Sequence, residues 1–435
     1  MNREITGDKY MHDAFDTLLE REVVKQVSDE AALRKQLQND TITLYAGFDP
    51  TADSLHLGHL FPLLCLARFQ KLGHKPIALV GGATGLIGDP SGKSAERLLL
   101  NEEIINANVQ SLKGQMERFL DFSGSNSALI TNNADWTKEM SYLDWLRDVG
   151  KHFSVNYMLS KESVRRRIED RSQGISYTEF SYMLIQANDF QELYKRHKCT
   201  LQVGGNDQWG NITAGIDLVQ KKHRVQAYGI TFPLLTTSSG EKFGKSEGNA
   251  VWLDPEKTSP YNLYQFWIRT DDSDVIRYLK YFTFLPISDI EELAKSVAEA
   301  PEKREAQKVL AEESTKMIHD EAGLLSAQRA SQVLFGGEIN NFTDRELSDI
   351  FNDVPSSDIE RGELEEGVGV LALFTKAGLT KSNGQAMQLI KQGGAYVNNI
   401  RIEDTRMVVT PDHLASESTM VIRSGKKKYH LVKVS

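Results

Sequence analysis

Short apolar runs alternate with amphipathic helical patterns through about the first 245 residues, and this alternation restricts the fold of the chain more than any other feature. The apolar runs lie at 41–48, 75–82, 127–133, 199–205 and 226–235. Strands that alternate with helices predict a parallel sheet covered by helices. We therefore expect an α/β fold whose residues 1–250 form a Rossmann-like, nucleotide-binding sheet domain.

The remainder of the chain changes character twice. From Ser259, an N-cap followed by proline, the pattern is all-helical to about residue 336, and Ser288 with Glu291 resembles a capping box. Residues 338–366 carry ten acidic and two basic residues, so we expect 337–367 to be an acidic linker or tether. Residues 368–435 read as a small α+β domain, with a short helix capped by Ser382 and two hairpins.

Charge is unevenly distributed along the chain. The net charge is −9, yet Val368–Ser435 contains ten basic and four acidic residues. A basic segment on an acidic protein indicates binding to a polyanion such as RNA, although a solvated basic surface has the same composition. Apolar runs are too short to span a membrane, and two cysteines, Cys65 and Cys199, do not suggest a disulfide framework. We expect a cytoplasmic protein.

The stretch Tyr45–His59 reads as a strand, a proline-containing turn at Asp49-Pro50-Thr51, and a helix that opens with His56-Leu57-Gly58-His59. The two histidines could be metal ligands, but no nearby side chain completes a metal site. They could also be purely structural. The third interpretation is that Gly58 admits a nucleotide to the helix start, where the positive helix end and the imidazoles face its phosphates.

A second candidate phosphate-binding segment is the polar loop that contains Lys242-Phe-Gly-Lys-Ser246. Two lysines on a mobile loop can neutralise the charge that develops on a phosphate chain. Alone, the loop would be read as solvated surface. The segment Gly85–Ser94 resembles a P-loop, but its glycine spacing fails, so a P-loop ATPase is disfavoured.

Two further segments carry candidate ligand-binding residues. Within the predicted helix 177–190, Tyr182, Gln186 and Asp189 share one face, which could bind an ammonium group and a polar ring substituent, or could be an exposed polar stripe. Gly204–Asn211 follows a strand and opens a helix, for which Asn206 or Asp207 is a plausible N-cap.

Together these motifs resemble those of tyrosyl-tRNA synthetases of the bacterial type, which belong to the class I aminoacyl-tRNA synthetases. His56–His59 is similar to the HIGH motif of that class, and Lys242–Ser246 to its KMSKS motif. The tyrosine-specific resemblance lies in YAGFDPTADSLHLGH, GATGLIGDPSGK, YTEFSYMLIQANDF, GGNDQWGNITAG and KTSPYNLYQFW. It is dense over residues 30–290, and residues 368–435 resemble a small RNA-binding module.

The resemblance implies a role for each matching residue. The catalytic group would be Thr51, His56, His59, Lys242 and Lys245. The tyrosine-binding group would be Tyr45, Asp89, Tyr182, Gln186, Asp189 and Gln208, with Tyr45 and Asp189 facing the phenol hydroxyl. The ATP-binding group would be Gly47, Asp49, Gly58, Gly205, Asp207 and Ser246.

The resemblance also implies the reaction and the partners. Such an enzyme would join L-tyrosine to its tRNA through tyrosyl-adenylate, using ATP with Mg²⁺ and no metal held by the protein itself. It would be a homodimer, with residues 251–336 reading the anticodon and no membrane partner. The rivals are the tryptophan enzyme, which shares the fold but whose indole offers only a donor to Tyr45 and Asp189, and a non-catalytic RNA-binding relative.

Overall fold

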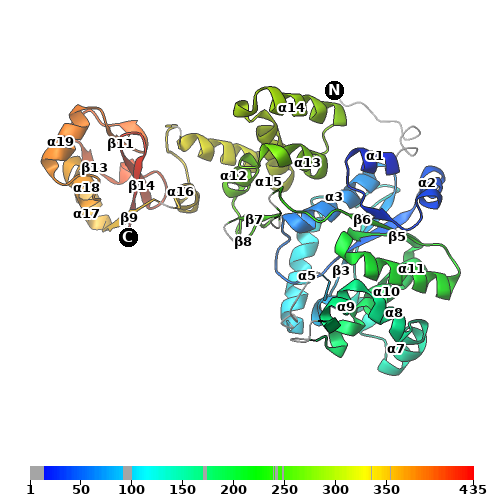
Figure 1. Ribbon diagram of the computed structural model, residues 1–435. Helices are drawn as coiled ribbons and strands as arrows, with labels where there is room; N and C mark the ends of the chain where they lie inside the picture. The colour runs from blue at the N-terminus through cyan, green and yellow to red at the C-terminus, as the bar shows by residue number, and fades with distance from the viewer. Residues whose placement is uncertain are drawn as a thin grey trace. The chain divides into compact units, whose positions relative to one another are not determined.

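The computed structural model describes residues 14–91, 100–169, 174–238, 240, 243–246, 249–334, 336–352 and 354–435. They form two compact units, each described separately below (Figure 1). The first unit holds the described residues up to Lys257 together with Thr270–Ala306, and the second holds Thr258–Arg269 and the described residues from Gln307 onward.

The first unit is built on a six-stranded sheet with the strand order β1-β6-β5-β2-β3-β4. Its strands are β1 (Gln26–Val27), β2 (Thr43–Phe48), β3 (Lys75–Val80), β4 (Leu129–Asn132), β5 (Cys199–Gly205) and β6 (Tyr228–Phe232). All neighbours pair in parallel except β1, which runs antiparallel to β6 at the edge. The predicted α/β class with a mainly parallel sheet is therefore confirmed, and each of the five predicted strands lies where it was expected.

Helices α3 (Leu57–Lys71), α5 (Glu102–Met116), α10 (Tyr177–His197) and α11 (Trp209–His223) pack against this sheet. On one face, Tyr45, Ile77 and Leu79 form a buried cluster with residues of α10 and α11. Side chains alternate along a strand, so Tyr45 points toward α10, where its ring lies 5.2 Å from that of Phe190. The smaller helices of this unit are α1 (Ala14–Glu20), α2 (Glu30–Asn39), α4 (Thr84–Ile87), α6 (Ala134–Thr137), α7 (Tyr142–Asp148), α8 (Val155–Ser160) and α9 (Glu162–Glu169).

Two predicted caps are wrong. Helix α14 (Ile287–Glu299) begins one residue before Ser288, and the Ser288 hydroxyl donates to the neighbouring Asp289 carboxylate instead of capping the helix. A single turn of 3₁₀ helix occupies Asn206–Gln208, and α11 begins only at Trp209. Neither Asn206 nor Asp207 is therefore the N-cap of α11, whereas the predicted Ser259 cap of α12 (Pro260–Ile268) is confirmed.

The region predicted to be helical contains α12, α13 (Asp272–Phe282), α14 and α15 (Glu305–Val333), but it does not form one compact unit. Helices α13 and α14 belong to the first unit, and α12 with most of α15 belongs to the second. Helix α15 breaks at Asp320, whose φ is 61° and whose carboxylate accepts from the backbone N–H groups of Ala322 and Gly323. No helix among the described residues combines the length and apolar character needed to cross a membrane.

The C-terminal part of the second unit contains a five-stranded sheet with the order β12-β11-β14-β15-β9. These strands are β9 (Ser356–Ile359), β11 (Ala395–Val397), β12 (Ile400–Arg401), β14 (Thr419–Ser424) and β15 (Lys428–Val434), and a separate pair joins β10 (Val368–Gly369) to β13 (Val408–Val409). Met420 and Ile422 face a core with α18 (Val370–Lys376) and α19 (Asn383–Lys391), whereas Val421 faces a second core. Ser382 caps α19 as predicted, and the predicted Asn398-Asn399 turn joins β11 to β12.

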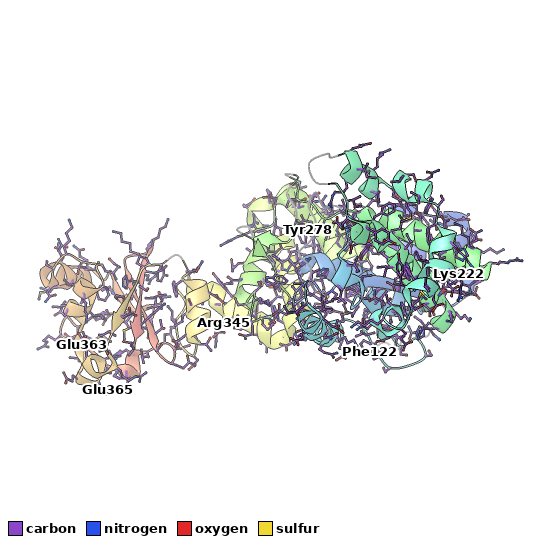
Figure 2. All side chains as sticks on the ribbon, turned by 90° about the horizontal axis from the view of Figure 1, so that it is seen from below. Phe122, Lys222, Tyr278, Arg345, Glu363 and Glu365 are labelled. Atoms are coloured by element: carbon purple, nitrogen blue, oxygen red, sulfur yellow. The ribbon has the colours of Figure 1, made fainter. Side chains whose placement is uncertain are left out.

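The acidic segment 338–366 differs from the expected tether. It folds into α16 (Asp344–Ile350), β9 and α17 (Arg361–Glu366), and β9 joins the sheet in parallel with β15. Glu363 and Glu365 lie exposed on either side of the buried Leu364 (Figure 2). Within this segment the buried anchors Ile359 and Leu364 stand among acidic residues, so the composition did not reveal them.

Candidate active site

The strand order of the first sheet reverses at β2. From β2 the chain runs outward to β3 and β4, and it then returns to β5 and β6 on the other side. In open α/β sheets, ligands bind beyond the carboxyl ends of the strands at such a switch point. Residues 49–51 leave the sheet there after β2, and residues 206–208 leave it after β5. The topology therefore brings together segments that are far apart in sequence.

The start of α3 joins the two histidines to a helix N-terminus. His56 is the N-cap, and its Nδ1 accepts a hydrogen bond of 3.0 Å from the Gly58 N–H. The His59 ring stacks on the His56 ring with centroids 3.8 Å apart, and its Nδ1 accepts from the His56 N–H at 3.5 Å. A Cβ at Gly58 would lie 2.8 Å from His56 Cε1, so glycine is needed for this stacking. Two imidazoles and a positive helix end are thus presented together, as a phosphate group requires.

Asp189 on α10 is the centre of a buried polar cluster beside Tyr45 of β2. Its exposed fraction is 1%, and its two oxygens accept hydrogen bonds from Asn133 Nδ2 at 3.0 Å and Trp136 Nε1 at 2.8 Å. Burial raises the pKa of this carboxyl to about 7, and the two hydrogen bonds oppose that rise. The Tyr45 hydroxyl is buried beside it without a hydrogen-bond partner, and its pKa is raised well above 10 by burial and by the charge of Asp189.

A buried phenol hydroxyl without a partner is costly, because desolvating an unpaired polar group costs about 1–3 kcal/mol. Tyr45 and Asp189 together could satisfy one ligand hydroxyl, which would accept from one and donate to the other. This pairing fits a hydroxylated aromatic ring, and a ring without the hydroxyl would leave both groups unpaired.

A second, partly buried network lies at the ends of β2 and β3. The Tyr182 hydroxyl donates to Asp49 Oδ2 at 2.9 Å, and the Thr84 hydroxyl donates to Asp49 Oδ1 at 2.6 Å. Thr84 also accepts from Asn133 Nδ2 at 3.0 Å, which joins this network to Asp189. The structure therefore places Asp49, which the resemblance assigns to ATP, next to residues assigned to tyrosine.

Gln208 and Asp89 meet although they are far apart in sequence. Gln208 Nε2 donates to Asp89 Oδ2 at 2.7 Å, and Asn211 Nδ2 donates to Gln208 Oε1 at 3.1 Å. The other Asp89 oxygen accepts from the Ser91 N–H at 2.9 Å. An acidic group held in this way can attract an ammonium group.

The loop with the second motif lies against the start of α3. Gly244 has a φ of 76°, and a Cβ built on it would lie 3.5 Å from Leu57 Cβ and 3.9 Å from the Gly58 nitrogen. Lys245 and Ser246 form the short strand β7 (Lys245–Ser246), which pairs with β8 (Asn249–Ala250). Lys242 lies outside the described residues. The backbones of the two motif segments therefore converge, as their predicted joint role in phosphate binding would require.

The other predicted site residues are more exposed to solvent than Asp189 and Tyr182. Gly47, Thr51 and Asp207 are exposed, and Gln186 on α10 is half-buried. A Cβ at Gly47 would meet nothing within 4 Å, and one at Gly205 would lie 2.6 Å from an Asp207 oxygen. No group of three or more histidine, cysteine, aspartate or glutamate side chains in the described part of the chain could hold a metal ion.

Sequence reasoning missed Asn133, Trp136 and Thr84. Asn133 and Trp136 orient the Asp189 carboxylate, and Thr84 links it to Asp49. The available signal was positional, since Asn133 directly follows β4 and Thr84 closely follows β3, at the edge where ligands bind. Nothing in the sequence indicated that these side chains would turn toward Asp189.

Comparison with known families covers most of the chain. The profile of class I tRNA synthetases for tryptophan and tyrosine matches residues 35–336. A second profile, described as the tyrosine–tRNA ligase SYY-like C-terminal domain, matches residues 346–432. The acidic segment from residue 346 onward thus falls within the second profile.

Individual relatives agree with these profiles. The chain is 54% identical over 415 residues to the tyrosine–tRNA ligase of Geobacillus stearothermophilus. The aligned residues make up 95% of this chain and 97% of that protein. It is 52% identical to the tyrosine–tRNA ligase of Rhodopirellula baltica, over 95% and 94% of the two chains. Among solved structures, a C-terminally truncated mitochondrial tyrosyl-tRNA synthetase from Aspergillus nidulans superimposes with a TM-score of 0.68 at 33% identity, over 76% of this chain and 98% of that one.

Proposed function

Because this chain belongs to the class I tyrosyl-tRNA synthetases and is a tyrosine–tRNA ligase, we propose that Asp189 and Tyr45 recognise the phenol hydroxyl of tyrosine. The observation that supports this proposal is the buried Asp189 carboxylate, held by two donors beside a Tyr45 hydroxyl without a partner. Tyr182, Gln186, Asp89 and Gln208 would surround the amino-acid ammonium and carboxylate groups. ATP–pyrophosphate exchange measured with each of the twenty amino acids tests the proposal, and exchange driven equally by phenylalanine would contradict it.

The chemistry needs little from the protein beyond position and charge. The ionised tyrosine carboxylate attacks the α-phosphorus of ATP, an O–P bond forms, and pyrophosphate leaves with its bonding electron pair. No side chain has to act as nucleophile or base, because the attacking group is already ionised. Catalysis then comes from alignment of the two substrates and from stabilisation of the charge on the leaving phosphates.

Within this scheme, the phosphate-contacting residues are His56 and His59 at the start of α3, with Thr51, Lys242 and Lys245. Gly47, Asp49, Gly58, Gly205, Asp207 and Ser246 would line the rest of the ATP site. Mg²⁺ favours phosphate oxygens and water over cages of protein ligands, so we assign it to the ATP phosphates and not to side chains. In the second step the terminal ribose hydroxyl of the tRNA attacks the tyrosyl carbonyl, and AMP leaves.

The Asp189 pKa implies a pH dependence of tyrosine binding. A pKa near 7 means that the carboxyl gains a proton as the pH falls below 7 and loses an acceptor site for the phenol hydroxyl. We expect the Kd for tyrosine to be constant at high pH and to rise by up to about tenfold per pH unit below the pKa. Equilibrium dialysis from about pH 5.5 to 8.5 measures this, with Asp189→Asn as the control that should show no such rise. A wild-type Kd that is flat across this range would contradict the role of an ionised Asp189.

We also propose that the enzyme is a homodimer, on the basis of exposed apolar side chains near α7, α8 and the start of α10. Tyr142, Leu143, Val155 and Tyr177 have exposed fractions of 63%, 76%, 61% and 64%. A side-chain hydrogen bond joins Tyr142 to Tyr177, so the patch spans two separate helices. Exposed apolar side chains gathered on neighbouring stretches of a chain are typical of an interface.

Replacing Leu143 with aspartate should weaken such a dimer by burying a charge in the interface. Sedimentation should show a shift toward the monomer for Leu143→Asp, whereas Leu325→Asp, at a similarly exposed leucine in the second unit, should remain dimeric. A wild-type protein that is monomeric at micromolar concentration would remove the proposal.

We further propose that residues 251–336, which are divided between the two units, contribute to anticodon recognition, and that residues 368–435 contribute to tRNA binding. Lys426, Lys427 and Lys428 lie exposed at the turn between β14 and β15. Changing all three to glutamine should weaken tRNA binding and lower its salt dependence by about 2–3 in log–log slope, while pyrophosphate exchange stays constant. An unchanged salt slope would show that these lysines do not contact phosphate.

The proposed compartment is the cytoplasm, since Cys65 and Cys199 are both buried and free, as a reducing compartment allows. Fractionation of the source cells tests this placement, and recovery of the enzyme in an organelle would contradict it.

A further inference from the structure

Phe243 is a buried aromatic residue in the middle of a loop motif that is otherwise small or polar. Its exposed fraction is 6%, and its ring lies on α13, with centroids 4.7 Å from Tyr278 and 5.1 Å from Phe282. Its N–H also donates to the Leu235 carbonyl at 3.2 Å. Figure 2 labels Tyr278, which α13 contributes to this contact. The loop is therefore fastened at the residue that directly precedes Gly244.

The same helix also holds the start of α3. The Phe61 ring, two residues after His59, stacks on Tyr281 with centroids 4.8 Å apart and lies 5.9 Å from Phe282. The fully buried Phe282 ring thus contacts Phe61 on one motif segment and Phe243 on the other. A single side chain of α13 connects the two segments that converge at the proposed phosphate site.

Two buried arginines fix the end of α13. Arg68, on α3 itself, donates to the carbonyls of Lys280, Tyr281 and Thr283 at distances between 2.6 and 3.2 Å. Arg21 donates to the carbonyls of Lys280, Thr283 and Leu285 at distances between 2.5 and 3.1 Å. The last carbonyls of a helix are otherwise unpaired and carry partial negative charge, which the guanidinium groups satisfy. Helix α13 therefore cannot shift relative to α3 without breaking buried hydrogen bonds.

Backbone contacts complete the connection. The Val251 N–H donates to the Gly244 carbonyl at 2.8 Å, and the Leu57 N–H donates to the Val251 carbonyl at 3.0 Å. The loop backbone is thus tied to the first turn of α3 through residue 251. Because Phe243 packs against α13, the backbone that begins at Gly244 is held close to the first turn of α3, where Gly58 lies.

We infer that Phe243, seated on Phe282 and Tyr278 of α13, is a positioning residue for adenylate formation, because it sets the loop that carries the second motif against the histidine-bearing start of α3. The inference rests on the proposed role of these two motif segments in adenylation. Phe243 touches no reacting atom. Its loss should misplace the loop in the activation step and leave the tyrosine-binding residues intact.

The test compares Phe243→Leu, Phe282→Leu and the double variant in the full-length enzyme. The expected result is a fall of about 10- to 100-fold in the single-turnover rate of adenylate formation for each single variant, with the Kd for tyrosine within about twofold of wild type. The double variant should be little slower than either single variant, because both remove the same contact. Phe243→Tyr, which keeps the ring, should restore most of the rate.

Two matched variants separate this inference from the function on which it rests. Phe69→Leu removes a fully buried ring from the same helix α3, where it lies against His74, and should leave the rate close to wild type. Lys245→Ala tests the motif itself. A slow Lys245→Ala enzyme together with an unaffected Phe243→Leu enzyme would overturn the positioning role alone, whereas a Lys245→Ala enzyme of normal rate would overturn the proposed role of the loop. Loss of tyrosine affinity in step with the rate, or multiplicative effects in the double variant, would also overturn the inference.

Discussion

Replacing Asp189 with alanine should lower kcat/KM for tyrosine by about a thousandfold, with little change in the KM for ATP. The change removes a charge-assisted hydrogen bond to the substrate, worth about 1.5–3 kcal/mol. It also leaves the Asn133 and Trp136 donors without their buried acceptor. Pyrophosphate exchange at varied tyrosine and ATP concentrations measures the two effects separately.

Two further variants test whether the expected loss is specific to tyrosine recognition by Asp189. Trp136→Phe keeps a ring but loses one donor to Asp189, so it should cost less than the alanine change while affecting tyrosine alone. Asp135→Asn removes the same charge from an exposed neighbour and should be silent. Equal losses for tyrosine and ATP in the Asp189 variant would show that Asp189 does not read the phenol.

The proposed recognition of the phenol hydroxyl would also account for selection against phenylalanine. A site built to hydrogen-bond a substrate hydroxyl rejects the analogue without it by about 10⁴- to 10⁵-fold, and the tyrosyl-tRNA synthetases are themselves the source of that figure. In this chain, phenylalanine would leave Tyr45 and Asp189 facing each other without a bridging hydroxyl. No separate editing site is needed for that discrimination.

Replacing His56 or His59 with alanine should slow adenylate formation by about a hundred- to a thousandfold, while the Kd for tyrosine stays near the wild-type value. The reason is that a donor aimed at charge which develops on the leaving phosphates acts only in the transition state. The two effects should not multiply in the double variant, because the rings stack on each other and orient each other.

His56 also caps α3, so a cap-preserving variant is needed. His56→Asn keeps an acceptor for the Gly58 N–H and should retain helix stability, which alanine would lower by about 1 kcal/mol. His197→Ala, at an exposed position near the end of α10, serves as the control. Single-turnover rates that match the wild type in both alanine variants would remove the histidines from the mechanism.

Much of the fold followed from local pattern. The strand at 43–48, the helix after Gly58 and the cap at Ser259 all come from spacing and from residue preferences that act within a few positions. The wrong caps at Ser288 and at Asn206 or Asp207 arose where several polar residues compete for one helix end, so that a shift of one or two residues changes the cap. The acidic segment 338–366 was misjudged because its net charge hid the apolar anchors Ile359 and Leu364.

The candidate site likewise contains some residues that sequence motifs indicated and others that only the structure brought to light. The sequence singled out Tyr45 and the two histidines because they stand in one recognisable motif, and Tyr182 and Asp189 because they stand in another. Asn133 and Trp136 were not singled out, since their importance comes only from hydrogen bonds to a side chain more than 50 residues away. Two other contacts also join segments that are distant in sequence. Gln208 donates to Asp89, and the Phe243 ring packs against Phe282 of α13.

By itself, the sequence determined most of the element types, the order of the strands of the first sheet along the chain and the family, because periodicity, turn chemistry and motif identity are local. Only the tertiary structure decided which side chains share a buried hydrogen-bond network, how α13 links the two motif segments, and that an acidic stretch completes a sheet. The physical reason is that burial and hydrogen bonding depend on what packs opposite a residue, and that partner comes from elsewhere in the chain.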